Sequence, residues 1–373
     1  MVHGTFTIPF ASTESPKGVM GLALPAYVGG EENRVISWVA GQLRSGAAPA
    51  NPVVFFGPVS SGKSMLLQAI RDEWHEHQEG PVLFTTGTDF ARHYADAIET
   101  DSVAEFRSKL FRSKLLIVDD LHFIAGKPAV QQEWILLLDQ AEKAGLTIVV
   151  SMDLPPNHQP GLTNKLASRL SGGIAVRIHL PAVDTRRAIV DLFLEHSGLS
   201  FPDEVTQVIA GQHPDTKPIF HSVPELRHAI LEIQEKAEQA GRQPSLEDAN
   251  ALLQQELSAR KPAMETIIKH VTRHLNISVR DLKSASRRQC VVRARGMVFY
   301  LARMLTEQSY EQLGEALGGR DHSTVIHACR RIEALIKSDA GFANTLERLV
   351  ERLADEVELG RKAGSTELQY STT

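Results

Sequence analysis

The residues best suited to chemistry lie in the segment GPVSSGKS, where glycine, lysine and serine follow the spacing G-x-x-x-x-G-K-S. An apolar run precedes it and an amphipathic run follows it, which favours a phosphate-binding loop between a strand and a helix over a plain glycine-rich turn. Lys63 would neutralise the β- and γ-phosphates, and the Ser64 hydroxyl would bind Mg²⁺. We therefore predict ATP and Mg²⁺ as cofactors, with the nucleotide held by Gly57, Ser60, Ser61, Gly62, Lys63, Ser64 and Met65.

Two carboxylates end a second apolar run, LLIVDD. In P-loop enzymes the first acid of such a strand, here Asp119, holds Mg²⁺, and the next, Asp120, is placed to polarise a water molecule. An acid in this position can also simply cap the following helix. A third apolar run ends at Ser151, so Asp153 is expected near the γ-phosphate.

Arg169 lies in the segment TNKLASRL, on a predicted helix that ends at a pair of glycines. It would either form a surface salt bridge within its own domain or reach the nucleotide of a neighbouring molecule as an arginine finger. From the residues alone the surface salt bridge is favoured.

Residues 309–337 have the pattern of a helix-turn-helix. The first helix runs from Ser309 to Leu317, and Asp321 is expected to cap the second. Apolar residues at helical spacing form its core side, namely Val325, Ala328, Cys329, Ile332 and Ile336. The other side and the N-terminal end carry the residues predicted to meet a DNA groove, which are His322, Ser323, Thr324, His327, Arg330 and Arg331.

Four further arginines precede this motif in SASRRQCVVRARG: Arg287, Arg288, Arg293 and Arg295. They are predicted to contact phosphates or a minor groove. Residues 260–337 hold 15 Lys or Arg and 7 Asp or Glu, a net charge of +8, against −13 for the rest of a chain whose total is −5. Such a basic segment is typical of a phosphate-rich partner. The alternative is a pair of packed amphipathic helices with solvated arginines.

The elements that must position these residues alternate between strand and helix. Strands are predicted at residues 52–56, 82–85, 115–119, 146–151 and 174–178, with helices that begin near Lys63, Thr88, Asp101 and Pro128. This alternation predicts an α/β fold with a parallel sheet. Residues 184–259 are predicted to form a helical lid, with Asp184 as the cap of a first helix that ends at Gly198, followed by helices near 202–213, 223–240 and 245–259.

The predicted organisation is therefore a loose arm (1–20), a nucleotide-binding core (21–183), a helical lid (184–261), a DNA-binding domain (262–360) and a disordered tail (361–373). Hydrophobic residues make up 42% and charged residues 23%, as in globular proteins. No apolar run approaches the ~18 residues of a membrane-spanning helix. With no secretory signal visible and only Cys290 and Cys329 present, we expect a cytoplasmic protein.

Several of these strings resemble one known family. GGRDHSTVIHACRRIE resembles the C-terminal signature of the DnaA family of bacterial chromosomal replication initiators. YVGGEENRVI, the P-loop, LLIVDDLHFIAGK and KLASRL resemble that family's AAA+ domain in the same order, so the resemblance covers about residues 21–337. It implies an AAA+ ATPase core with a helical lid, followed by an all-α helix-turn-helix domain.

The resemblance also implies function. It predicts a weak ATPase used as a switch, which binds short duplex repeats at the replication origin. The ATP form would assemble into a homo-oligomer that opens the DNA and holds single strands. By position, Val28 matches the adenine-side segment, Asp119 and Asp120 the Walker B acids, Asp153 a sensor acid and Arg169 the arginine finger. The duplex-reading helix matches Arg320, Asp321, His322, Ser323 and Thr324.

The chain departs from the family at several places. Only about 20 residues precede the core, so no N-terminal helicase-contacting domain, and no helicase contact of the usual kind, is expected. Pro224 stands where the lid would carry a sensor arginine, with Arg186 and Arg227 as the nearest substitutes. Gln289 occupies a minor-groove arginine position, and Ala129 a usually basic place near the retained Lys127.

These departures leave alternatives open. One is a sequence-specific DNA-binding regulator, related to DnaA, in which ATP is mainly structural. Another is a helicase loader, which would not need the C-terminal recognition helix. The basic amphipathic stretch METIIKHVTRHL allows a weak contact with acidic membrane lipids, although an inter-domain linker helix is the favoured interpretation.

Overall fold

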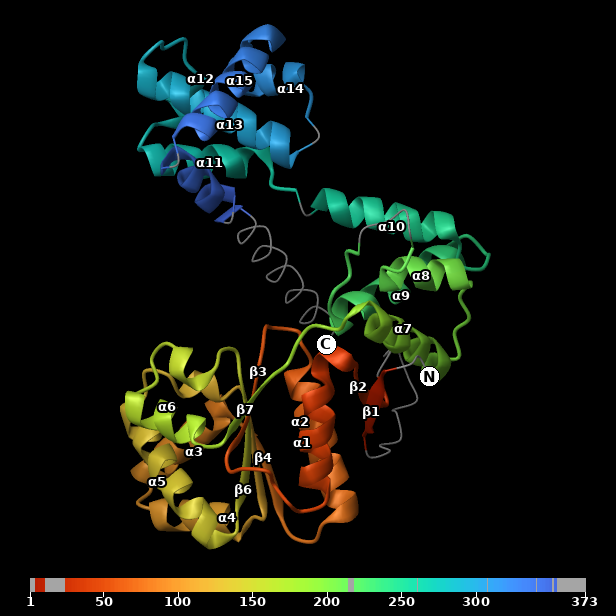
Figure 1. The fold of residues 1–373 in the computed structure, drawn as a ribbon, viewed down its shortest axis with the longest axis vertical. Helices are drawn as coiled ribbons and strands as arrows, with labels where there is room; N and C mark the ends of the chain where they lie inside the picture. Colours follow the sequence, from red (N-terminus) through yellow and green to blue (C-terminus); the bar gives the residue numbers. More distant parts are fainter. Residues whose placement is uncertain are drawn as a thin grey trace. The chain divides into compact units, whose positions relative to one another are not determined.

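The computed structural model describes residues 4–10, 24–213, 218–259, 261–306, 308–339, 341–350 and 352–353. The chain divides into two compact units, residues 1–252 and 253–373 (Figure 1). The predicted disordered tail lies outside the described residues. Among the described residues, no helix is long and apolar enough to span a membrane.

The first unit is built on a five-stranded sheet in the order β4-β5-β6-β3-β7, in which every neighbouring pair is parallel. This confirms the predicted α/β sheet, and each strand ends within one residue of its predicted bounds. The strands are β3 (Val53–Phe56), β4 (Val82–Thr86), β5 (Leu115–Asp119), β6 (Thr147–Met152) and β7 (Ile174–Arg177).

Helices cover both faces of this sheet (Figure 1). Because strand side chains alternate, Val53 and Phe55 pack on the side of α1 (Arg34–Arg44) and α2 (Lys63–His77), while Val54 packs on the opposite side. That opposite side is covered by α3 (Gly87–Glu99), α4 (Val103–Arg112), α5 (Pro128–Ala144) and α6 (Asn164–Ser171). Short 3₁₀ helices connect these elements at η1 (Glu31–Asn33), η2 (Leu121–Ile124) and η3 (Pro156–His158).

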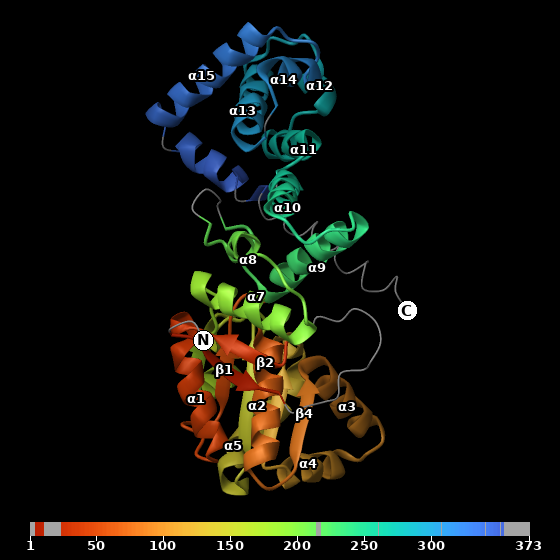
Figure 2. The same cartoon turned by 90° about the vertical axis from the view of Figure 1, so that its right-hand side faces the viewer.

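The predicted loose arm is wrong for part of its length. Residues Phe6–Pro9 form β1, which pairs antiparallel with β2 (Ala26–Gly29). Ile8 and Tyr27 are buried in the same core as α1 and α2, and burial of these side chains stabilises the short pair. Figure 2 shows β1 and β2 beside α1 and α2. The sequence does not indicate this strand, because β1 has only four residues and ends in proline. Residues 11–20 lie outside the described part of the chain.

Four helices follow the sheet: α7 (Val183–Ser197), α8 (Asp203–Ala210), α9 (Val223–Gln239) and α10 (Leu246–Ala259). Gly198 ends α7 in the left-handed conformation, as predicted. The predicted cap at Asp184 is wrong, because α7 begins one residue earlier with Ala182 as its N-cap; Asp184 lies in the first turn, where a carboxylate favours the helix dipole. The boundary between the two units falls within α10, before the predicted end of the lid.

The second unit is helical, with α11 (Met264–Leu275), α12 (Val279–Lys283), α13 (Gln289–Leu305), α14 (Tyr310–Ala316) and α15 (His322–Ser338). Residues 341–350 are also helical. A single apolar core joins these helices, and it includes Ile267, Val271, Phe299, Val325 and Leu346. The apolar face of α11, for which a weak contact with acidic membrane lipids was considered, is thus buried inside the unit.

Candidate nucleotide and DNA sites

The P-loop connects β3 to α2 in a conformation that depends on glycine. Gly62 has φ +91°, and a Cβ at Gly57 would lie 2.4 Å from the Ile178 carbonyl oxygen. Lys63, the first residue of α2, is 7% exposed. Its Nζ donates to the carbonyls of Gly57 (3.0 Å) and Pro58 (3.2 Å) and to Asp153 Oδ1 (2.8 Å). An incoming phosphate would therefore compete with Asp153 for this ammonium group.

The carboxyl ends of β5 and β6 bring the predicted acids together. Asp119 accepts a hydrogen bond of 2.5 Å from the Ser151 hydroxyl, and Ser151 Oγ accepts one from the backbone N–H of Asp120. Ser151, which is fully buried, was missed as a site residue because the sequence marked only the end of its strand. Asp120 has φ +52°, and burial together with the Asp119 charge raises the pKa of its carboxyl.

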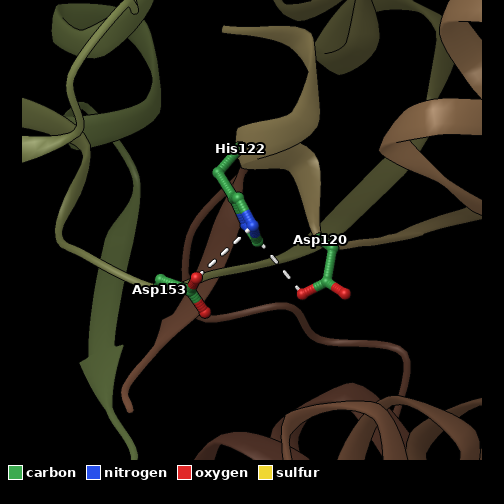
Figure 3. Close-up of side chains that lie close together, drawn as sticks. All are labelled: Asp120, His122 and Asp153. Carbon is green, nitrogen blue, oxygen red and sulfur yellow. Dashed lines mark ion pairs between the residues drawn. The ribbon is translucent and has the colours of Figure 1, made fainter. Parts of the chain in front are cut away.

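His122 is a second site residue that sequence reasoning missed. Its Nε2 lies 3.4 Å from Asp153 Oδ2 and its Nδ1 lies 3.9 Å from Asp120 Oδ1 (Figure 3). The three side chains are close enough to suggest a metal site. However, each ring nitrogen faces a different carboxylate, and one ion binds imidazole through one nitrogen only. The arrangement fits an imidazole that bridges two acids better than a chelate.

The residues predicted to hold Mg²⁺ fit that ion. Ser64 is exposed at the start of α2, which follows β3. Asp119 lies at the end of β5, and β6 separates β5 from β3 in the sheet. Hydroxyl and carboxylate oxygens are the hard ligands that Mg²⁺ prefers, with water and phosphate oxygens completing its coordination. The bound ion would neutralise charge on the phosphates.

A small pocket beside the P-loop is lined by both core and lid. Val28, Ser61, Gly62 and Met65 contribute from the core, and Ile189 and Val223 from the lid helices; its remaining walls are Leu24, Tyr27, Asn33, His179 and Pro181. The space that these residues enclose is only about that of a water molecule, so the walls would have to move apart to admit a base. The structure thus places Val28 and Met65, predicted to bind nucleotide, in the wall of one pocket.

Arg169 lies on α6 and forms an exposed ion pair with Asp139 of α5, with 2.6 Å between Nε and Oδ1. The guanidinium therefore has a local partner, as the residues alone suggested, but it stands at the surface, where exposed ion pairs exchange readily with water. The geometry within one chain is compatible with both predicted roles.

Pro224 occupies the first turn of α9, a position where its missing N–H is harmless. The Glu225 carboxylate accepts from the backbone N–H groups of His221 (2.7 Å) and Ser222 (3.1 Å), which fixes the helix start. Arg186 is not available as a substitute sensor, because it is buried and donates to the carbonyls of Ala210 and Pro181. Arg227 is exposed on α9.

We expect Pro224→Arg to sharpen the preference of the monomer for ATP over ADP by roughly tenfold, because a hydrogen bond to a charged phosphate contributes about 1.5–3 kcal/mol. Calorimetric dissociation constants for both nucleotides provide the measurement. Pro224→Ala is the matched control, since it removes the ring without adding charge. Strong discrimination in the wild type, lost in Arg227→Ala, would show that Arg227 already performs this role.

In the second unit, α14 and α15 form the predicted helix-turn-helix. Val325, Cys329 and Ile332 of α15 are buried. Its N-terminal end and outer side expose His322, Ser323, Thr324, His327, Arg330 and Arg331. Asp321 precedes the helix but makes no capping bond; its carboxylate instead lies 2.8 Å from His322 Nδ1.

The basic segment divides into exposed and buried arginines. Arg287 and Arg288 are exposed before α13, and Arg293 is exposed on α13, where its guanidinium lies 4.5 Å above the Phe342 ring. Arg295 departs from the prediction of a DNA contact: it is 5% exposed and donates to backbone carbonyls. Arg320, also predicted to read DNA, is half-buried and donates to the Ser284 carbonyl.

Taken together, a P-loop, two strand-end acids and a helical lid define an AAA+ ATPase, and this one also carries a helix-turn-helix. Residues 22–177 match the bacterial DnaA ATPase domain, and residues 264–332 match the bacterial DnaA helix-turn-helix. The chain belongs to the DnaA family of bacterial chromosomal replication initiators.

Individual relatives agree with this assignment. The chromosomal replication initiator DnaA of Symbiobacterium thermophilum is 33% identical over 337 residues, which cover 88% of this chain and 72% of that protein. The Nostoc initiator is 30% identical over 331 residues, with 88% and 70% covered. Among solved structures, AMPPCP-bound DnaA from Aquifex aeolicus has a TM-score of 0.53 at 26% identity, covering 88% of this chain and 96% of that one. A DnaA bound to AMPPCP and single-stranded DNA gives 0.52 at 25%, covering 88% and 95%.

Proposed function

We propose that this protein is an ATP-dependent initiator of chromosomal replication that acts in the cytoplasm. It binds duplex repeats at the origin through α15 and oligomerises in its ATP form to open the DNA. The observation that supports this proposal is that one chain combines a glycine-dependent P-loop, whose Lys63 donates to the strand-end acid Asp153, with an exposed polar helix in a helix-turn-helix. A relative bound to AMPPCP and single-stranded DNA supports the same assignment.

The deciding experiment is a nuclease footprint on the replication origin of the organism that encodes the chain. With ATP and Mg²⁺ the protected region should extend beyond the individual repeats, whereas ADP should leave protection at isolated repeats. The second candidate, a DNA-binding regulator in which ATP is structural, is favoured only by Pro224. It predicts the same footprint with either nucleotide.

Helicase recruitment is not assigned to any described residue. For single-stranded DNA, Lys127 at the start of α5 is exposed and remains a candidate contact, next to the uncharged Ala129. Lipid binding gains no support, because the apolar side of α11 is already buried.

Arg169→Ala should bind ATP normally as a monomer but fail to form ATP-dependent oligomers on DNA, because the neighbour's γ-phosphate would lose its cationic partner. Electron microscopy of ATP complexes on origin DNA is the measurement. Asp139→Ala is the matched control: it breaks the same ion pair but leaves the guanidinium free, so its oligomers should persist. Normal oligomers of Arg169→Ala would assign the residue to its local salt bridge alone.

A further inference from the structure

Arg295 organises the segment that leads into the exposed arginines of the second unit. Its Nε donates to the carbonyl of Leu282 (2.6 Å) and its Nη1 to that of Ser286 (2.8 Å). Its Nη2 donates to the carbonyls of Ser284 (2.7 Å) and Asp281 (3.3 Å). One buried guanidinium thus binds four carbonyls, two in α12 and two in the loop between α12 and α13. Four of its five N–H donors are therefore engaged within the protein, and the side chain is buried, so it does not point to solvent where a phosphate would lie.

The turn of the helix-turn-helix is tied to the same segment. Arg320, the last residue of that turn, donates through Nη2 to the Ser284 carbonyl, which therefore accepts from both Arg320 and Arg295. The turn also lies close to the end of α12, because a Cβ at Gly318 would lie 2.4 Å from the Lys283 carbonyl oxygen. Two cations are thus held close together, and burial together with the nearby Arg320 charge lowers the pKa of Arg295.

We propose that Arg295 and Arg320 are positioning residues that fix the basic loop, residues 284–288, against the N-terminal end of α15. The loop carries Arg287 and Arg288, and the helix end carries Ser323 and Thr324. Holding the two at one spacing lets both engage the same duplex without a further loss of conformational freedom on binding. The inference rests on the proposed DNA-binding function and adds to it a mechanical link between two contact surfaces.

The test is a double-mutant cycle on the full-length protein with ATP, using fluorescence anisotropy with an origin-repeat duplex. In the wild type, Arg288→Ala should weaken binding by roughly tenfold. In an Arg295→Met background, where the loop is no longer held, the same change should weaken binding by less than about threefold. Equal losses in both backgrounds would overturn the proposal.

Arg295→Lys separates positioning from direct contact. Lysine keeps the charge but cannot donate to four carbonyls in the geometry of a guanidinium. In an Arg295→Lys background, Arg288→Ala should therefore weaken duplex binding by less than about threefold, as in the Arg295→Met background. Near-wild-type affinity of Arg295→Lys would restore the direct phosphate contact and contradict the proposal. A wild type that binds no duplex would instead refute the proposed function itself, which is a distinct result.

Two adjacent glycines supply a second route that leaves Arg295 in place. Gly318 and Gly319 both have positive φ, +95° and +67°, so alanine strains the backbone at either. Only at position 318 would the new methyl group meet the backbone of Lys283, the residue that precedes the basic loop; at Gly319 nothing lies within 4 Å. In a Gly318→Ala background, Arg288→Ala should therefore cause a smaller loss of duplex affinity than in the wild type. In a Gly319→Ala background the loss should remain about tenfold. Identical behaviour of the two alanine variants would contradict the link.

Discussion

Lys63→Ala is expected to weaken ATP binding by at least ~100-fold, which corresponds to about 3 kcal/mol. The structure gives the reason: the ammonium group is buried beneath the P-loop, within reach of two loop carbonyls and of Asp153. An incoming phosphate would compete with Asp153 for this group, and His122 Nε2 lies 3.4 Å from the Asp153 carboxylate. Isothermal titration calorimetry with ATP and Mg²⁺ measures the effect.

Arg71→Ala is the control for this change, because Arg71 lies on the same helix but pairs with Asp72 and Phe84. Its ATP affinity should match the wild type. Duplex binding should persist in both variants, since the recognition helix belongs to the other unit. Unchanged ATP affinity in Lys63→Ala would remove the nucleotide site from the P-loop.

The second large effect concerns base reading. Thr324→Ala should relax discrimination at one base position by ~1–3 kcal/mol, because Thr324 is exposed at the N-terminal end of α15, the end that a recognition helix would place in a major groove. Arg293→Ala should instead weaken specific and random duplexes alike and reduce the slope of log K against log salt by about 1. Binding titrations over a series of salt concentrations and single-base substitutions distinguish the two.

Arg303→Ala controls for the packing that Arg293→Ala removes. Both arginines are exposed on α13 and both lie over an aromatic ring, Phe342 for Arg293 and Tyr310 for Arg303. Only Arg293 belongs to the predicted DNA surface, so Arg303→Ala should leave the salt dependence unchanged. The same sequence-independent loss in Thr324→Ala and Arg293→Ala would show that α15 does not read bases.

Sequence reasoning worked best where one local pattern determines the outcome. The central strands β3, β5 and β6 are almost entirely buried and are continuous apolar runs, and all five strands from β3 to β7 begin and end within a residue of their predicted bounds. The P-loop and the acids of β5 follow from spacing alone. The helix start at Pro224 likewise follows from the fixed φ of proline and the carboxylate one residue later.

The sequence did not reveal features that depend on a residue far away in the chain, or on the side of a helix from which a side chain points. The β1–β2 pair depends on pairing of Phe6 with Gly29, and a strand of four residues is too short to give a recognisable sequence pattern. Arg295 was counted with its exposed neighbours because a string of arginines does not show which side of a helix each occupies. Ser151 and His122 gain their roles only because parallel strands end at one edge of the sheet, which brings β5 and β6 together.

The pocket beside the P-loop has a consequence for the integrity of the first unit. Its walls come from Leu24 near one end of that unit and from Val223 in the lid near the other, so a nucleotide bound there would touch segments that the chain itself connects only through the whole sheet. Such a nucleotide would act as a non-covalent cross-link between distant parts of the polypeptide. By mass action such a ligand raises the melting temperature in proportion to the logarithm of its concentration. A cell's supply of adenine nucleotide would thereby set the lifetime of the folded ATPase against proteolysis, as well as its state of assembly.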